Sequence, residues 1–278
     1  MRIEFYGVRG SMPAAGPAYI KYGGNTACVH VQLKDGTDLI LDSGTGIVEL
    51  GHKLVQKDTP IHLLLSHNHW DHIQGFPFFL PAHQSQRRLV ITPGLTEPTA
   101  DKAILEQMSG TYFPLHHTDL KANIKIDTHN EADTWSIGPA TISRQRLNHP
   151  SAGSAYCIQT PDCKLAYVTD NELYPPYPEA TSYQQWIDFI AAADVLIHDA
   201  QYTESDMPFK HGWGHSLVEQ AIMLAQDAKV KKCVLYSHDL ARNDESVDAQ
   251  LKKMQQIAAE RTPEIEIIAA YEGLVLDY

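Results

Sequence analysis

The segment Ser66–His72 concentrates the metal-binding chemistry of this chain. Its sequence is Ser-His-Asn-His-Trp-Asp-His, so three imidazoles and one carboxylate lie within six residues. The apolar run His62–Leu65 comes directly before it and predicts a buried strand that ends where these side chains begin. Imidazole nitrogens and carboxylate oxygens are the donors that zinc and similar divalent metals prefer. The segment therefore predicts a metal site at the end of a strand.

Four more predicted strands end in a side chain that can bind metal. A single histidine in such a place is more often a hydrogen-bonded core or surface residue than a ligand. Four of them in a chain that already carries the histidine-rich segment favour a shared site. These strand ends carry His149, Asp170, His198 with Asp199, and His238.

Composition excludes several classes of protein. The 278 residues are 43% hydrophobic, which is ample for a core, and no run of eighteen apolar residues predicts a membrane span. The first residues predict a strand and not a signal peptide. The four cysteines are far apart, which is typical of a reduced, cytoplasmic protein. The net charge of −12 argues against a general nucleic-acid binder, but a local metal cluster can still attract a small phosphate ester.

The elements that must position these donors occur as two successive runs of strands followed by helices. We predict an α/β fold, a four-layer αββα sandwich, that forms a single domain over residues 1–278. The predicted helices span 46–56, 99–108, 183–192, 216–228 and 245–260. The predicted strands span 3–8, 27–33, 38–42, 62–65, 89–92, 124–127, 140–147, 155–159, 164–169, 195–198, 233–237 and 264–269.

The chain resembles the metallo-β-lactamase fold superfamily. The resemblance is carried by Leu41-Asp42-Ser43-Gly44, the His67–His72 segment, His149, Asp170 and His238, in this order. Within the superfamily it resembles the phosphodiesterase branch, which includes cyclic-phosphate phosphodiesterases and tRNA 3′-processing endonucleases. That closer resemblance is carried by residues 7–13, 23–29, 112–114 and 198–200, and by the Gly-Trp-Gly-His-Ser segment at 212–216.

The resemblance implies two divalent metal ions. Zn²⁺ is the first expectation, and Mn²⁺ and Fe²⁺ are the alternatives. Asp42 would support the site by hydrogen bonding. The implied ligands are His67, His69 and His149 for the first ion, Asp71, His72 and His238 for the second, and Asp170 between them.

Such a centre is suited to phosphodiester hydrolysis. Two ions can share a hydroxide that attacks phosphorus, and with two aspartates and that hydroxide the cluster keeps about one positive charge. The leaving alkoxide then needs a proton, for which His215, oriented by Asp199, is the first candidate and Asp71 the second. Arg9, Ser11 and Asn25 lie in a glycine-rich loop and are candidates for phosphate contacts.

The expected substrate is a small, cyclic phosphodiester or a nucleotide. Only twenty residues separate His149 from Asp170, where similar tRNA-processing enzymes carry a basic arm, and the net charge is −12. We therefore expect neither tRNA nor a membrane as partner, and the resemblance implies a homodimer.

Two other functions stay open for the same metal site. One is a lactonase or thioester hydrolase, although an acyl hydrolase has no use for an added His–Asp pair. The other is a non-catalytic, metal-dependent sensor, which a full ligand set disfavours.

Overall fold

Two seven-stranded sheets face each other in the computed structural model, which describes residues 1–95, 100–129, 133–262 and 264–278. The first sheet has the order β14-β1-β2-β3-β4-β5-β6 and the second β13-β12-β11-β10-β9-β8-β7. In the first sheet the strands are β1 (Arg2–Gly7), β2 (Cys28–Gln32), β3 (Asp38–Leu41), β4 (Ile61–Leu64), β5 (Arg88–Thr92), β6 (Asn123–Ile126) and β14 (Val275–Asp277). In the second they are β7 (Thr134–Ile137), β8 (Ala140–Arg146), β9 (Ser154–Gln159), β10 (Lys164–Val168), β11 (Val195–Asp199), β12 (Lys232–Tyr236) and β13 (Glu266–Ala269).

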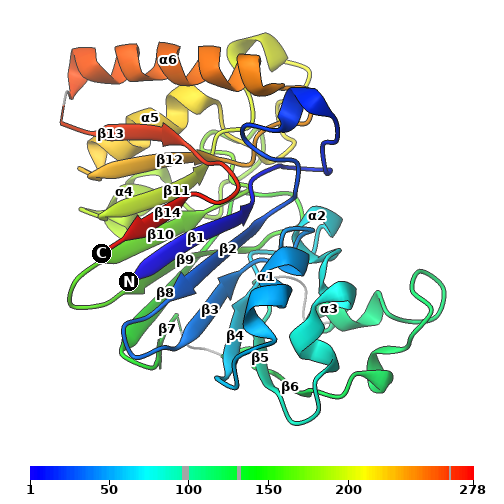
Figure 1. Ribbon diagram of the computed structural model, residues 1–278. Helices are drawn as coiled ribbons and strands as arrows, with labels where there is room; N and C mark the ends of the chain where they lie inside the picture. Colours follow the sequence, from blue (N-terminus) through cyan, green and yellow to red (C-terminus); the bar gives the residue numbers. More distant parts are fainter. Residues whose placement is uncertain (96–99, 130–132, 263) are drawn as a thin grey trace.

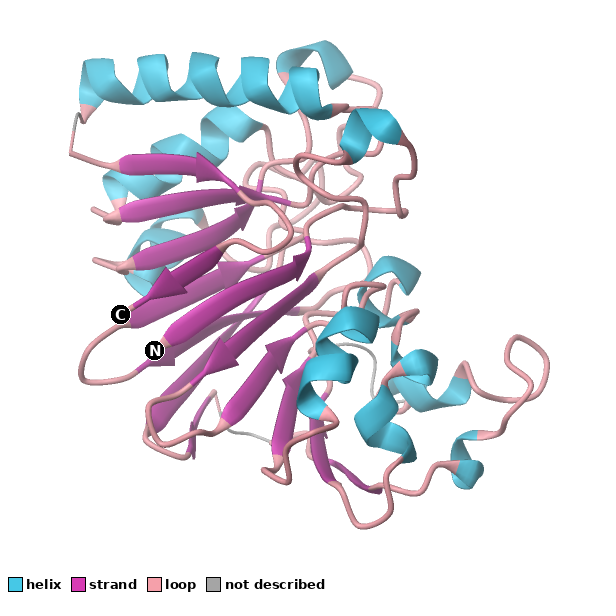
Figure 2. Ribbon diagram, in the orientation of Figure 1, coloured by secondary structure: helices cyan, strands magenta, loops and turns pink. Residues whose placement is uncertain are grey.

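Helices cover the outer face of each sheet (Figures 1 and 2). On the first sheet, Ile47 and Leu50 of α1 pack into one buried cluster with Ile40 of β3. On the second, Trp186 of α4 and Ile222 of α5 belong to another buried cluster. The predicted αββα sandwich is confirmed. The helices are α1 (Ile47–Leu54), α2 (Trp70–Ile73), α3 (Ala103–Glu106), α4 (Tyr183–Ile190), α5 (Val218–Asp227) and α6 (Asp244–Arg261).

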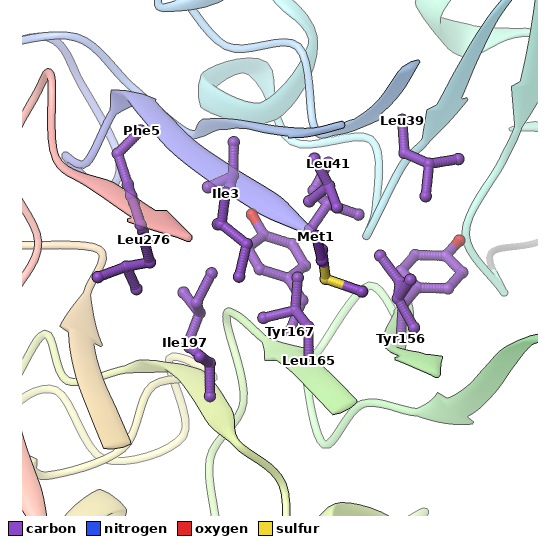
Figure 3. Packing of buried hydrophobic residues seen from close by; sticks show 14 of the residues in the cluster. Met1, Ile3, Phe5, Leu39, Leu41, Tyr156, Leu165, Tyr167, Ile197 and Leu276 are labelled. Carbon is purple, nitrogen blue, oxygen red and sulfur yellow. The ribbon is translucent and has the colours of Figure 1, made fainter. Parts of the chain in front are cut away.

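The main core lies between the sheets. Side chains of β1 and β3, such as Ile3 and Leu41, meet Leu165 and Ile197 of the second sheet (Figure 3). All four are at most 1% exposed. Burial of this apolar surface is the main force that holds the two sheets together.

Three tyrosines of the second sheet add directional bonds across this core. Each lies on a different strand and donates its hydroxyl to the first sheet or to the loop that follows it. The bonds run from Tyr156 to the Leu65 carbonyl, from Tyr167 to the Asp42 carboxylate and from Tyr236 to the Gly7 carbonyl, each at 2.7 Å. The rings themselves belong to the apolar cluster.

Parallel pairing places the donor side chains at one edge. Strands β3 to β6 run parallel in the first sheet, and β10 to β13 run parallel in the second. The carboxyl ends of parallel strands meet at the same edge of a sheet, where ligand sites form in α/β folds. The loops after β3, β4, β10, β11 and β12 therefore converge.

The structure departs from the predicted helices and strands in four places. The short helix α2, in the histidine-rich segment, was not predicted. Strands β7 and β14 were not predicted. The helix predicted over 99–108 is shorter, since α3 spans Ala103–Glu106, and Thr99 lies outside the described residues. Among the described residues, no helix is long and apolar enough to cross a membrane.

Candidate metal centre

Six of the seven predicted ligands lie in two overlapping groups. Within each group, one ligand atom of each residue lies within 4.8 Å of the others. Asp170 belongs to both groups, as expected for a carboxylate between two ions. The first group is His67, His69, His149 and Asp170, and the second is Asp71, His72 and Asp170.

Two carboxylates of the site lie at strand ends in the left-handed region of backbone space. Asp42 follows β3 with φ of 60°, and Asp170 follows β10 with φ of 52°. Such a conformation costs a non-glycine residue about 1–3 kcal/mol and persists where surrounding contacts impose it. Both side chains are almost fully buried, so the fold holds these carboxylates in fixed directions.

Asp42 supports the site through hydrogen bonds, as predicted. Its carboxylate accepts from the Ser66 backbone N–H at 2.6 Å and from the Tyr167 hydroxyl at 2.7 Å. It also lies 2.8 Å from Nδ1 of His72. Because Nδ1 is taken, the other ring nitrogen of His72 faces Asp71 and Asp170, at 3.2 and 3.3 Å.

The side chains fit divalent metal ions. Nε2 of His67 and Nε2 of His72 are buried and have no hydrogen-bond partner in the described part of the chain. Nε2 of His67 lies 3.6 Å from Asp170, and Nε2 of His149 lies 3.1 Å from Nδ1 of His69. These nitrogens are buried, face a carboxylate or one another, and are not all satisfied by hydrogen bonds. A bound cation would satisfy them as its ligands.

Burial also keeps the first group in the protonation state that binds metal. It lowers the pKa of His67 well below its usual range, and the neighbouring His72 adds to this. Burial likewise lowers the pKa of His149 to about 4. Neutral imidazole is the form that coordinates metal, so both rings are competent near neutral pH.

His215 and Asp199 form the predicted pair beside the metal groups. Nδ1 of His215 lies 3.1 Å from the Asp199 carboxylate, and its Nε2 lies 4.0 Å from Asp170. Asp199 is fully buried and also accepts from the backbone N–H groups of Asn171 and Ser216. Burial alone would lower the pKa of His215, but the carboxylates of Asp199 and Asp170 raise it to about 9.

Two supporting residues were missed by sequence analysis. Glu172 is 1% exposed and accepts from the backbone N–H groups of Gly212 and Gly214, at 2.9 and 3.0 Å. It therefore fixes the loop that presents His215. Asn148, also buried, bonds to the backbone of Thr181 through both its amide nitrogen and its oxygen. Glu172 lies two residues after Asp170, and Asn148 lies one residue before His149. Their position next to predicted ligands was the signal by which the sequence could have indicated them.

The structure does not bring His238 to the other predicted ligands. Ser237, with φ of 57°, turns the chain after β12, and Nε2 of His238 donates to the Ala270 carbonyl at 2.9 Å. His198 is also outside both metal groups, and its Nδ1 lies 2.5 Å from the Asp199 carbonyl. These two histidines bond to backbone carbonyls, so the second group holds three residues rather than the four expected.

The loop residues proposed as phosphate contacts have other partners. Arg9 is fully buried and donates to the carbonyls of Gly23 and Arg242. Asn25 donates to Glu272. The backbone N–H of Ser11 donates to the Asp71 carboxylate at 2.7 Å and so orients a predicted ligand. This loop supports the site instead of lining it with cations.

Comparison with known proteins identifies the family. The family described as Beta-lactamase superfamily domain matches residues 37–238, more than half of the chain. Ribonuclease Z of Staphylococcus haemolyticus is 22% identical over 324 residues, which cover 99% of this chain and 100% of that protein.

Solved structures share the fold over the whole chain. The metallo-beta-lactamase fold protein YhfI from Bacillus subtilis has a TM-score of 0.70 and 18% identity, and covers 99% of each chain. A diphosphatase of the PhnP family has a TM-score of 0.69 and 15% identity, with 100% of this chain and 97% of that chain covered. Human tRNase Z, short form, has a TM-score of 0.63 and 15% identity, with 100% and 99% covered. The chain belongs to the beta-lactamase superfamily and has the predicted metallo-β-lactamase fold.

Proposed function

We propose that this protein is a dinuclear metal-dependent phosphodiesterase that hydrolyses a small phosphodiester. The first ion would be held by His67, His69, His149 and Asp170, and the second by Asp71, His72 and Asp170. Two such ions, when bound, stabilise charge on the phosphoryl oxygens and lower the pKa of water to near neutrality. Residues of the chain itself orient the substrate and supply the proton that the leaving oxygen needs.

The observation that carries this proposal is the His215–Asp199 pair. Asp199 accepts from Nδ1 of His215, and because the pKa of His215 is raised to about 9, the ring is an imidazolium near neutral pH whose Nε2–H faces the metal groups. That nitrogen lies 4.0 Å from Asp170, within reach of a leaving oxygen bound at the same place. Hydrolysis of a diester expels an alkoxide that needs such a proton.

Asp71 is the less favourable proton donor. One of its carboxylate oxygens accepts from the Ser11 N–H at 2.7 Å and lies 3.2 Å from Nε2 of His72. The interaction with His72 and this hydrogen bond lower the pKa of Asp71 against the effect of burial. A carboxylate so held is ionised and acts as a ligand, so we assign proton donation to His215.

A small substrate agrees with the shape of the chain after His149. Strands β9 and β10 form a tight antiparallel hairpin in the interval up to Asp170, which leaves no room there for a long basic arm. The alignment with the staphylococcal ribonuclease Z spans 324 positions, 46 more than the 278 residues of this chain, so that relative carries segments absent here. We therefore propose a cyclic phosphodiester or a nucleotide as substrate.

An RNA substrate is the second candidate, because relatives that span the whole chain are ribonucleases by name. A precursor tRNA with a 3′ trailer separates the two candidates. Cleavage of this RNA at a rate above that of small diesters would overturn the small-substrate proposal and keep the phosphodiesterase.

Hydrolysis of bis(p-nitrophenyl) phosphate by the Zn²⁺- or Mn²⁺-loaded protein tests the metal chemistry. The proton donor is tested with adenosine 2′,3′-cyclic phosphate, whose leaving group is an alkoxide. We expect His215→Ala to lower kcat by about 10²–10⁴-fold, the usual contribution of a general acid, with unchanged metal content. His52→Ala, an exposed histidine on α1, is the matched control and should keep full activity. Opening of a homoserine lactone without any diester cleavage would instead make the protein an acyl hydrolase.

A further inference from the structure

A cavity of about 740 Å³ opens beside the first metal group, and its volume is typical of small-molecule sites. His69 and His149 line the end of the cavity that adjoins the metal centre. Nδ1 of His69 lies 3.1 Å from Nε2 of His149. Arg146, the last residue of β8, lines the same cavity three residues before His149. Three residues of extended chain span at most about 10 Å, so one small molecule can contact both Arg146 and the metal end of the cavity.

The lining of this cavity differs from the rest of the protein in its charge. The whole chain carries a net charge of −12, yet no carboxylate occurs among the described residues that line the cavity. Arg146 is the one arginine or lysine among them. Its guanidinium makes no ion pair or hydrogen bond within the described residues, whereas Arg144, two residues earlier, donates to the carbonyls of Thr128 and His129. Arg146 is exposed, so its planar donors are free to pair with the phosphate or carboxylate oxygens of a molecule in the cavity.

The part of the lining that carries Tyr177 and Pro178 is held in place by the buried Asn148. Its oxygen accepts from the backbone N–H groups of Ala180 and Thr181, at 2.8 and 2.9 Å. The Thr181 hydroxyl in turn donates to the Arg146 carbonyl at 2.5 Å. The loop that carries Tyr177 and Pro178 is thus tied to the end of β8. Its tyrosine and proline give the cavity an apolar surface against which a sugar or base can pack.

We propose that Arg146 selects substrates that carry a second phosphate, and that this cavity binds the part of the substrate between the two phosphates. This inference rests on the proposed phosphodiesterase function. The scissile diester lies at the metal groups, the body of the molecule packs on Tyr177 and Pro178, and the second phosphate pairs with Arg146. Arg146 is then a specificity-determining residue that takes no part in the chemical step.

The test compares adenosine 2′,3′-cyclic phosphate with the same molecule carrying a 5′-phosphate. For the Mn²⁺-loaded wild type we expect a KM at least tenfold lower for the 5′-phosphorylated substrate, with similar kcat. Arg146→Gln should remove this difference and leave the KM for the plain cyclic phosphate unchanged. Arg88→Gln, at an exposed arginine of β5, is the matched control and should keep the difference.

Equal KM values for the two substrates in the wild type, or a KM difference that persists in Arg146→Gln, would overturn the role of Arg146. Neither result would contradict the proposed phosphodiesterase function. If neither compound is cleaved, the proposed function fails, and binding decides the inference separately. Calorimetry with adenosine 2′,5′-bisphosphate and adenosine 2′-monophosphate should then show at least tenfold tighter binding of the bisphosphate, lost in Arg146→Gln. A similar affinity for both compounds would overturn it.

Discussion

At the scale of single residues, the site depends on side chains that never face the substrate. Glu172 is the clearest case, since one buried carboxylate receives the N–H groups of both Gly212 and Gly214. These glycines flank Trp213 and lead directly to His215. A side chain added at Gly214 would meet the His149 ring at 2.0 Å, so this loop and a predicted metal ligand are in close contact. The position of the proposed proton donor is thus set by Glu172.

We expect Glu172→Gln to lower both stability and turnover. The amide keeps one acceptor but turns an N–H₂ group toward one glycine N–H, which costs about 1–3 kcal/mol in the free energy of unfolding. The loosened loop should lower kcat for diester hydrolysis more than it raises KM. Urea unfolding and steady-state kinetics measure the two effects. Glu179→Gln, an exposed glutamate that is not bonded to this loop, serves as the control; equal stability and equal kcat in the two variants would contradict the assignment.

Most ligands could be predicted at the residue scale, because donor type and strand-end position are both properties of the sequence. His238 shows where that reasoning stops. Its place after β12 is as predicted, but the direction of its ring follows from the backbone turn at Ser237 and from the Ala270 carbonyl, which belongs to another segment. Arg9 fails for the same reason, since the carbonyls that it binds come from loops distant in sequence. Side-chain direction is a tertiary property.

At the scale of elements, strands buried on both faces were the easiest to predict. Strands β4, β10 and β11 are mostly apolar and buried, as parallel strands between two layers are. Strand β7 alternates between exposed and less exposed residues, and β14 is only three residues long. The pairing of β14 with β1 joins distant parts of the chain, and no local pattern indicates it. Both missed strands therefore lie at the edge of a sheet.

Asp38, the first residue of β3, joins several elements on the outer side of the first sheet. Its fully buried carboxylate lies 2.9 Å from Nε2 of His30 on β2 and accepts from Lys57 and Thr59, both at 2.8 Å. Burial alone would raise the pKa of Asp38, but these partners lower it below its usual value. A carboxyl with a lowered pKa stabilises the folded state wherever it is ionised.

We expect Asp38→Asn to lower the free energy of unfolding by about 3 kcal/mol at pH 6. Since the folded pKa is the lower one, the contribution of Asp38 is fully present above its unfolded pKa of about 3.9. It is lost as the pH falls below that value. The difference between wild type and variant should therefore shrink below about pH 4 in urea unfolding followed at several pH values. A difference that grows as the pH falls would exclude this origin, and Asp58→Asn, at an exposed aspartate, should show none.

At the scale of the whole molecule, the metal centre lies where the two sheets meet. His67, His69 and His72 follow β4 of the first sheet, whereas His149 and Asp170 follow β8 and β10 of the second. Ions bound by these residues would link the two halves of the sandwich. A ligand that binds only the folded state stabilises it by mass action.

Removal of metal should therefore lower the melting temperature. At a metal concentration 1,000-fold above Kd, binding stabilises the folded state by about 4 kcal/mol, which a chelator would remove. Differential scanning calorimetry with Zn²⁺ and with EDTA measures this difference. In His67→Ala the two melting temperatures should converge, because its nitrogen is lost from the first group. Equal melting temperatures for the metal-loaded and metal-free wild type would contradict a site between the sheets.

The three tyrosine hydroxyls that cross the core have a mechanical consequence. Apolar contact between two sheets is non-directional, so it opposes separation far more than sliding of one layer over the other. The bonds from Tyr156, Tyr167 and Tyr236 are directional and have fixed end points, near β4, at Asp42 and at the end of β1. They therefore oppose sliding of one sheet over the other. Because a catalytic geometry tolerates little misplacement, a slip of about 1 Å between the layers would disable a centre built from both.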